Sequence, residues 1–135
     1  MAAEAVIIEL LGFAKGEPMT YTIADTAFPK GTVMQLSGDR TIAAHTGVDE
    51  PIAGILACEM VASDLAVTAP VYTNGVFDMT AAAGGVTARG ALCAGSATAN
   101  MITVADANDI LQWSTIGHCL EAHANDEVAA VRILK

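Results

Sequence analysis

Cysteine and histidine side chains are the groups in this chain whose types suit nucleophilic or metal chemistry. The cysteines lie far apart, without a Cys-x-x-Cys spacing, at Cys58, Cys93 and Cys119. The histidines are His45, His118 and His123. His118 and Cys119 are neighbours, so in a strand their side chains point to opposite faces and form no catalytic dyad. A cross-strand meeting of His118 with Cys58 or Cys93 remains the alternative that an enzyme would require.

A metal centre is not expected from the spacing of these residues. Zinc takes four closely spaced ligands, and the nearest cluster, His118, Cys119 and His123, has no fourth member. We expect His45 and His123 to lie in solvated loops. The acidic residues expected to cap or solvate turns are Asp106, Asp109, Asp126 and Glu127. We therefore predict no catalytic residue, no metal and no cofactor, and hence no enzyme.

The composition excludes two classes of partner. The 135 residues carry a net charge of −9, and the six basic residues are scattered singly. Phosphate neutralisation drives nucleic-acid affinity, so we expect no nucleic acid as a partner. The same charge disfavours an anionic membrane, and no apolar run has the length of a membrane span. The N-terminus has no basic start, so we expect synthesis in a cytoplasm.

Short β-rich segments separated by turn signals predict a mainly β fold, a compact β-barrel or β-tulip-like module. We expect an extended N-terminal arm over residues 1–18 and a β domain over residues 19–135. The expected strands are 19–24, 32–36, 41–44, 52–58, 66–72, 76–79, 91–94, 101–104, 114–121 and 128–134. Residues 59–64 could make one helical turn, and 105–111 are a loop or a single helical turn. Thr73-Asn74-Gly75 predicts a tight hairpin turn.

The chain also repeats itself weakly about its central stretch, Leu65–Leu92. Lys30-Gly31 before one strand is echoed by Arg89-Gly90 before another. The segment IAGILACE is echoed, one residue shorter, by IGHCLE, and an acidic turn then leads to an Ala/Val strand in both copies. These echoes predict a duplicated β module.

Four segments resemble a family of small tailed-phage capsid decoration (cement) proteins: VYTNGVFDMTAAAGGVTARGALC, then IGHCLE, the terminal VAAVRIL, and the earlier MTYTIADTAFPKGTVMQLSG. The likeness covers about residues 19–135; the arm lies outside it, and IAGILACE departs by its extra residue. The resemblance implies a homotrimer on the exterior of an icosahedral virion. There it would bind the major capsid protein lattice and stabilise contacts between capsid subunits.

Contacts with the capsid or between subunits are predicted for residues of the arm and for the single tryptophan: Ala5, Val6, Ile7, Ile8, Leu10, Leu11 and Trp113. The β-branched arm would add a strand to an exposed edge of the capsid protein or of an adjacent subunit. Trp113 is an interface anchor or a core filler. The alternative function is a small-molecule or glycan-binding β module on a virion or cell surface, with Tyr21, Tyr72 and Trp113 as the candidate aromatic residues.

Overall fold

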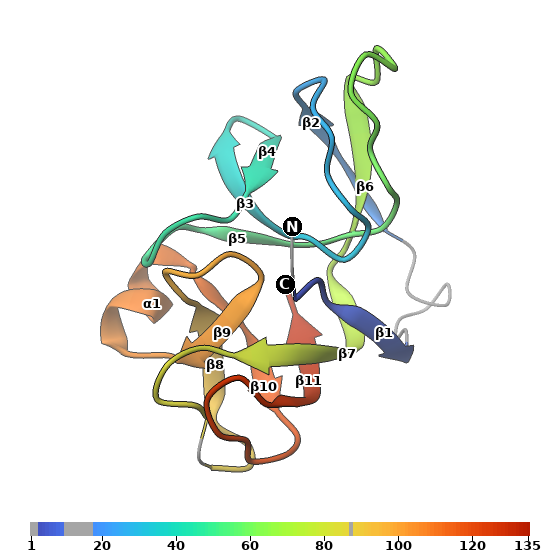
Figure 1. The fold of residues 1–135 in the computed structure, drawn as a ribbon. Helices are drawn as coiled ribbons and strands as arrows, with labels where there is room; N and C mark the ends of the chain where they lie inside the picture. Colours follow the sequence, from blue (N-terminus) through green and yellow to red (C-terminus); the bar gives the residue numbers. More distant parts are fainter. Residues whose placement is uncertain (1–2, 10–17, 87) are drawn as a thin grey trace.

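The computed structural model describes residues 3–9, 18–86 and 88–135, and these form two small β-barrels that lie against each other (Figure 1). The first barrel closes in the order β2-β4-β3-β5-β6. Its strands are β2 (Met19–Ile23), β3 (Val33–Gly38), β4 (Thr41–Ala44), β5 (Ile52–Leu56) and β6 (Thr68–Tyr72). The prediction of a mainly β, barrel-forming chain is confirmed.

The second barrel has the order β7-β11-β10-β8-β9 and closes through pairing of β7 with β9. Its elements are β7 (Asn74–Ala81), β8 (Leu92–Gly95), β9 (Met101–Val104), α1 (Ala107–Gln112), β10 (Thr115–Cys119) and β11 (Val128–Leu134). The N-terminal strand β1 (Val6–Glu9) pairs antiparallel with β7. The predicted β domain, 19–135, thus spans both barrels.

The two barrels have the same topology. If β2 to β6 are matched in order with β7 to β11, each strand of the first barrel has the same two neighbours as its counterpart in the second. Each barrel has a single parallel pairing, β2 with β4 and β7 with β9. Each also has a bulge where a strand passes its glycine: Gly54 lies opposite Met34, and Gly117 lies opposite Cys93. The predicted duplication is therefore present in the fold.

Strand β5 joins the two barrels because it is buried on both faces (Figure 1). Ala53 and Leu56 pack in the core of the first barrel. Ile52 and Ile55 pack in the core of the second barrel. A strand covered on both sides must be apolar along its whole length, which the sequence IAGIL satisfies. β11 instead alternates buried and exposed residues, as a strand with one solvated face does.

Two local predictions are wrong. Asn74-Gly75 makes no hairpin, because β6 pairs with β2 and β5 while β7 pairs with strands of the second barrel. The chain crosses from one barrel to the other at this point, and β7 already begins at Asn74. Residues 59–64 form no helical turn; Met60 there makes a β-bridge with Phe28.

Candidate functional site

The histidine and cysteine predicted to face apart do so. The His118 side chain is exposed on β10, and its Nδ1 lies 3.1 Å from the carbonyl oxygen of Gly90. The side chain of Cys119 is buried in the barrel core. Cys93 lies on the neighbouring strand β8, one residue from the cross-strand partner of His118, but its side chain is buried while that of His118 is exposed, so the two point to opposite faces of the sheet.

The expectation that His45 and His123 lie in solvated loops is wrong, since both are buried. His45 follows β4 and inserts its ring between the barrels, where its Nε2 donates a hydrogen bond of 3.0 Å to the carbonyl oxygen of Ser96. A Cβ atom on Gly95 would lie 2.3 Å from that nitrogen, so only glycine leaves room for the ring. Burial lowers the pKa of His45 below its ordinary value.

His123 lies beside Cys119, with which the sequence spacing grouped it only as part of an incomplete metal cluster. Its Nδ1 lies 3.2 Å from the Sγ of Cys119 and 3.1 Å from the carbonyl oxygen of Glu121. Burial raises the pKa of the Cys119 thiol and raises that of Cys93 to about 12. Because the thiolate is the reactive form, a raised pKa lowers the fraction of each thiol that can act as a nucleophile at neutral pH.

Three carboxylates come together at the start of α1. One oxygen each of Asp49, Asp106 and Asp109 lies within 4.8 Å of the others, the arrangement among the described residues best able to meet a divalent cation. Asp109 accepts hydrogen bonds from the Asp106 amide and the Ser114 hydroxyl, and Asp106 accepts from two helix amides. The predicted capping role of Asp106 and Asp109 is confirmed, because together they form a capping box. Capping accounts for the positions of Asp106 and Asp109, and Asp49 joins them from the β4–β5 connection.

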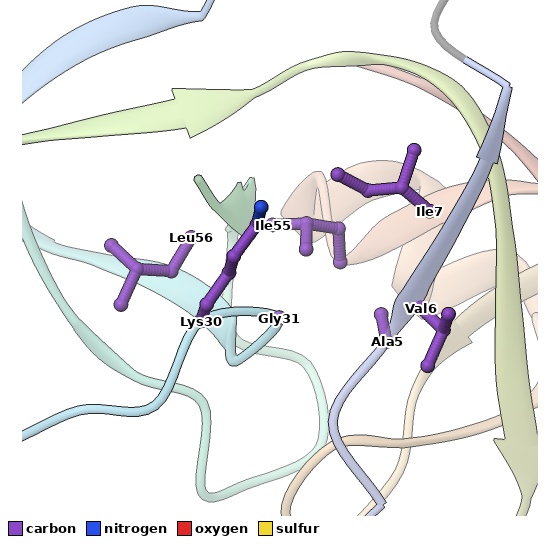
Figure 2. Close-up of a pocket in the computed structure, with 7 residues that line it drawn as sticks. All are labelled: Ala5, Val6, Ile7, Lys30, Gly31, Ile55 and Leu56. Carbon is purple, nitrogen blue, oxygen red and sulfur yellow. The ribbon is translucent and has the colours of Figure 1, made fainter. Parts of the chain in front are cut away.

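An apolar cleft of about 340 Å³ lies between β1 and the first barrel (Figure 2). Its lining residues are Ala5, Val6, Ile7, Lys30, Gly31, Ile55 and Leu56. In Figure 2 the Lys30 side chain extends alongside Ile55 and Leu56, which places one ammonium group at an otherwise aliphatic cleft. This volume lies at the lower limit for sites that hold a small molecule.

A first exposed apolar surface, which we name the tip patch, lies on the connection between β5 and β6. It consists of Val61, Leu65 and Val67, and the Leu65 side chain is 82% exposed. This loop projects at the end of the first barrel, at the top of Figure 1. Several exposed aliphatic residues on one connection are a feature of interaction surfaces.

A second surface, the helix patch, lies on α1 and the residue after it. It consists of Ile110, Leu111 and Trp113, with Leu111 81% exposed and Trp113 49% exposed. The Nζ of Lys135 lies 4.3 Å from the centre of the indole and donates hydrogen bonds to the carbonyl oxygens of Trp113 and Thr115. Burial lowers the pKa of this ammonium to about 8. The helix patch therefore holds a fixed aromatic anchor.

The two patches lie where the barrels differ. The β5–β6 connection holds residues 57–67, whereas its counterpart between β10 and β11 holds the shorter and polar 120–127. Helix α1 replaces the short connection between β4 and β5 of the first barrel. Each barrel closes without a counterpart of the other's patch, so the shared barrel topology does not depend on such a patch.

The contact residues predicted from the sequence lie in different environments in the structure. Ala5 is buried in the core, Val6 is exposed and Ile7 packs partly against the core. The segment that contains them pairs with β7 of its own chain. Ile8 lies in β1, and Leu10 and Leu11 lie outside the described residues. Trp113 is in the helix patch.

Sequence reasoning missed the tip patch because it placed Val61 in a possible helical turn over 59–64 and Val67 in a strand over 66–72. Aligning the two copies reveals the signal: the longer connection of the first copy carries aliphatic residues where the second has Asn125-Asp126-Glu127.

Comparison with known proteins assigns no family. No protein-family model matches the chain, and no curated protein matches it in sequence. Within the part of the chain that the structure describes, no helix has the length and hydropathy needed to cross a membrane.

Proposed function

We propose that this protein is a capsid decoration protein. It binds the exterior of an icosahedral virion head as a homotrimer and stabilises contacts between major capsid protein subunits. The four sequence segments that resemble decoration proteins support this function, and they fall on strands of both barrels.

The observation that carries the proposal is the pair of separate apolar patches, one on each barrel. The β5–β6 connection, which carries the tip patch, and α1, which carries the helix patch, lie well apart in Figure 1, at the top and at the left. A chain with two separate apolar interaction surfaces can bind two neighbouring subunits at once. Linked binding of this kind gains affinity through multivalency, which is what a cement protein needs.

The chemistry of the interior agrees with a mechanical role. Among the described residues, the closest cysteine–histidine pair is Cys119 with His123, and burial raises the pKa of its thiol. The net charge of −9 favours a protein partner over nucleic acid or an anionic membrane. Cyclic symmetry would let one patch meet a complementary surface on the next subunit without forming fibres.

Co-sedimentation tests this function. The protein is mixed with expanded empty shells of the major capsid protein encoded in the same genome, and its mass in solution is measured by light scattering. We expect a trimer that pellets with the shells at a saturating stoichiometry. A protein that stays in the supernatant at every concentration would contradict the proposal.

A small-molecule-binding module is the second candidate, and the cleft beside β1 is the observation that favours it. Its aliphatic walls and the Lys30 ammonium suit a short aliphatic carboxylate. A glycan site has less support, because Tyr21 is buried and Tyr72 packs against Phe77. A thermal shift with octanoate that Lys30→Met abolishes would favour this candidate, and no shift would eliminate it.

A further inference from the structure

The tip patch differs from its counterpart in the second barrel by conformation as well as by residue type. Leu65 adopts a left-handed backbone with φ of 56°, and the β10–β11 connection places Asp126 in this conformation with φ of 61°. Aspartate tolerates this region, whereas a bulky aliphatic residue is disfavoured there. A leucine at position 65 is thus unfavourable both for its backbone conformation and because its apolar side chain contacts water. A partner that covers the side chain would account for its presence there.

The base of the tip patch is fixed by backbone hydrogen bonds. Phe28 and Met60 exchange bonds of 3.0 and 2.8 Å at one end of the connection. At the other end the Ile23 amide donates a 3.1 Å bond to the carbonyl oxygen of Val67. A surface held in this way loses little freedom on binding, and preorganisation raises affinity.

Charge identifies the kind of surface that would cover the tip patch. Residues 57–67 contain Glu59 and Asp64, both exposed, and no lysine, arginine or histidine. A second copy docked by this same patch would bring these carboxylates together, and like charges face to face disfavour a complex. The complementary partner is an apolar depression flanked by lysine or arginine side chains.

We infer that the tip patch is the anchor that inserts into a basic-rimmed apolar depression on the outer face of the major capsid protein. This inference rests on the proposed function and names the part of the molecule that faces the shell. The helix patch, in which Lys135 lies over Trp113, does not enter this depression and remains available for contacts with other surfaces.

The test compares Leu65→Asn with Leu120→Asn in shell co-sedimentation. Asparagine suits a left-handed backbone, so Leu65→Asn removes the apolar side chain and keeps the fold. Leu120 is an exposed leucine of the second barrel and serves as the matched control. We expect affinity to fall at least about tenfold for Leu65→Asn, the scale of a lost buried leucine, and to be unchanged for Leu120→Asn.

A second variant tests the charge argument. Asp64→Lys is expected to weaken shell binding at low salt, and the difference from the unaltered protein should shrink at high salt because salt screens exposed charges. Equal or tighter binding by Asp64→Lys would overturn the assignment of a basic-rimmed partner.

The possible outcomes distinguish a failure of the tip patch as anchor from a failure of the proposed decoration function. If the unaltered protein pellets and Leu65→Asn pellets equally well, the tip patch is not the anchor and the decoration function stands. Equal losses for Leu65→Asn and Leu120→Asn would also overturn the anchor. If Leu65→Asn dissociates the oligomer in solution, the patch joins copies of this chain instead. If the unaltered protein ignores the shells, the proposed function and the anchor both fail.

Discussion

At the scale of single residues, two equivalent glycines set how closely neighbouring strands approach. A Cβ atom on Gly54 would lie 2.2 Å from the carbonyl oxygen of Tyr72, and one on Gly117 would lie 1.9 Å from that of Arg132. Both contacts are with backbone, which cannot swing aside as a side chain does. The same steric requirement therefore recurs at the same place in both barrels.

Gly117→Ala is expected to destabilise the protein by at least about 3 kcal/mol, because the new methyl group would force β10 away from β11. Gly38→Ala is the control, since its Cβ would come no closer than 3.6 Å to Thr41. That change should stay within about 0.5 kcal/mol. Urea denaturation of both variants measures the difference, and equal stabilities would contradict the close approach.

His45 should make stability depend on pH. Burial lowers its pKa in the folded state below the ordinary value of 6.5. The unfolded chain therefore binds the proton more readily, so this contribution to stability is present above pH 6.5 and is lost as the pH falls toward the folded-state pKa. Glu50 opposes the shift by favouring the charged ring, and the bond to the Ser96 carbonyl does the same.

We expect the free energy of unfolding to decrease between pH 7.5 and 5.5, with a slope of up to about 1.4 kcal/mol per pH unit from this group. His45→Gln should show a smaller decrease over the same interval. Parallel curves for the two proteins would mean that His45 does not titrate differently on folding.

At the scale of elements, β1 is held onto the two barrels from opposite sides. It pairs with β7 of the second barrel, and the Ala5 amide donates a 2.7 Å hydrogen bond to the carbonyl oxygen of Gly31 in the first. A Cβ atom on Gly31 would lie 2.3 Å from the Ala5 carbonyl oxygen, so the strand needs glycine in that turn.

Gly31→Ala should be more damaging than Gly90→Ala at the equivalent turn. Both glycines have positive φ, at 90° and 79°, but a Cβ on Gly90 meets nothing within 4 Å. Gly90→Ala should cost about 1–2 kcal/mol from the backbone alone. Gly31→Ala should cost at least about 1 kcal/mol more and should speed hydrogen exchange at the β1 amides. Similar losses and unchanged exchange would show that β1 does not depend on this turn.

The strands could be predicted from the sequence because most are short alternating runs bounded by turn residues. Residues 128–134 and 101–104 were located to the residue, and the loop-or-helix segment 105–111 overlaps α1. Which strands pair with each other was harder to predict. Asn74-Gly75 has the local preference of a hairpin turn, yet the strands on either side of it pair with strands of different barrels. Local propensity carries no information on that choice.

The site was less predictable for a related reason. Burial of His45 depends on contact with Gly95 and Ser96 of the other barrel, and burial of His123 depends on its bridge to Val86, far away in the sequence. Leu65 is exposed because it lies on the β5–β6 connection, which is longer than the corresponding β10–β11 connection. Trp113 was identified by residue type alone, while its contact with Lys135 brings together parts of the chain that only the fold places side by side.

At the scale of the whole molecule, duplication gives one chain two versions of a single barrel. The closing pattern, the parallel pair and the bulge are common to both, and the apolar patches are particular to each. The shared features serve folding, so the differing connections are free to carry different contacts. This division suits a protein whose work is to hold neighbouring surfaces together.

The most direct test is a cryo-electron microscopy map of expanded empty shells incubated with the protein. The account predicts trimers of two-barrel density on the outer surface, with the β5–β6 connection inserted into the major capsid protein. Bare shells at saturating protein, or density with this connection pointing into solvent, would contradict it.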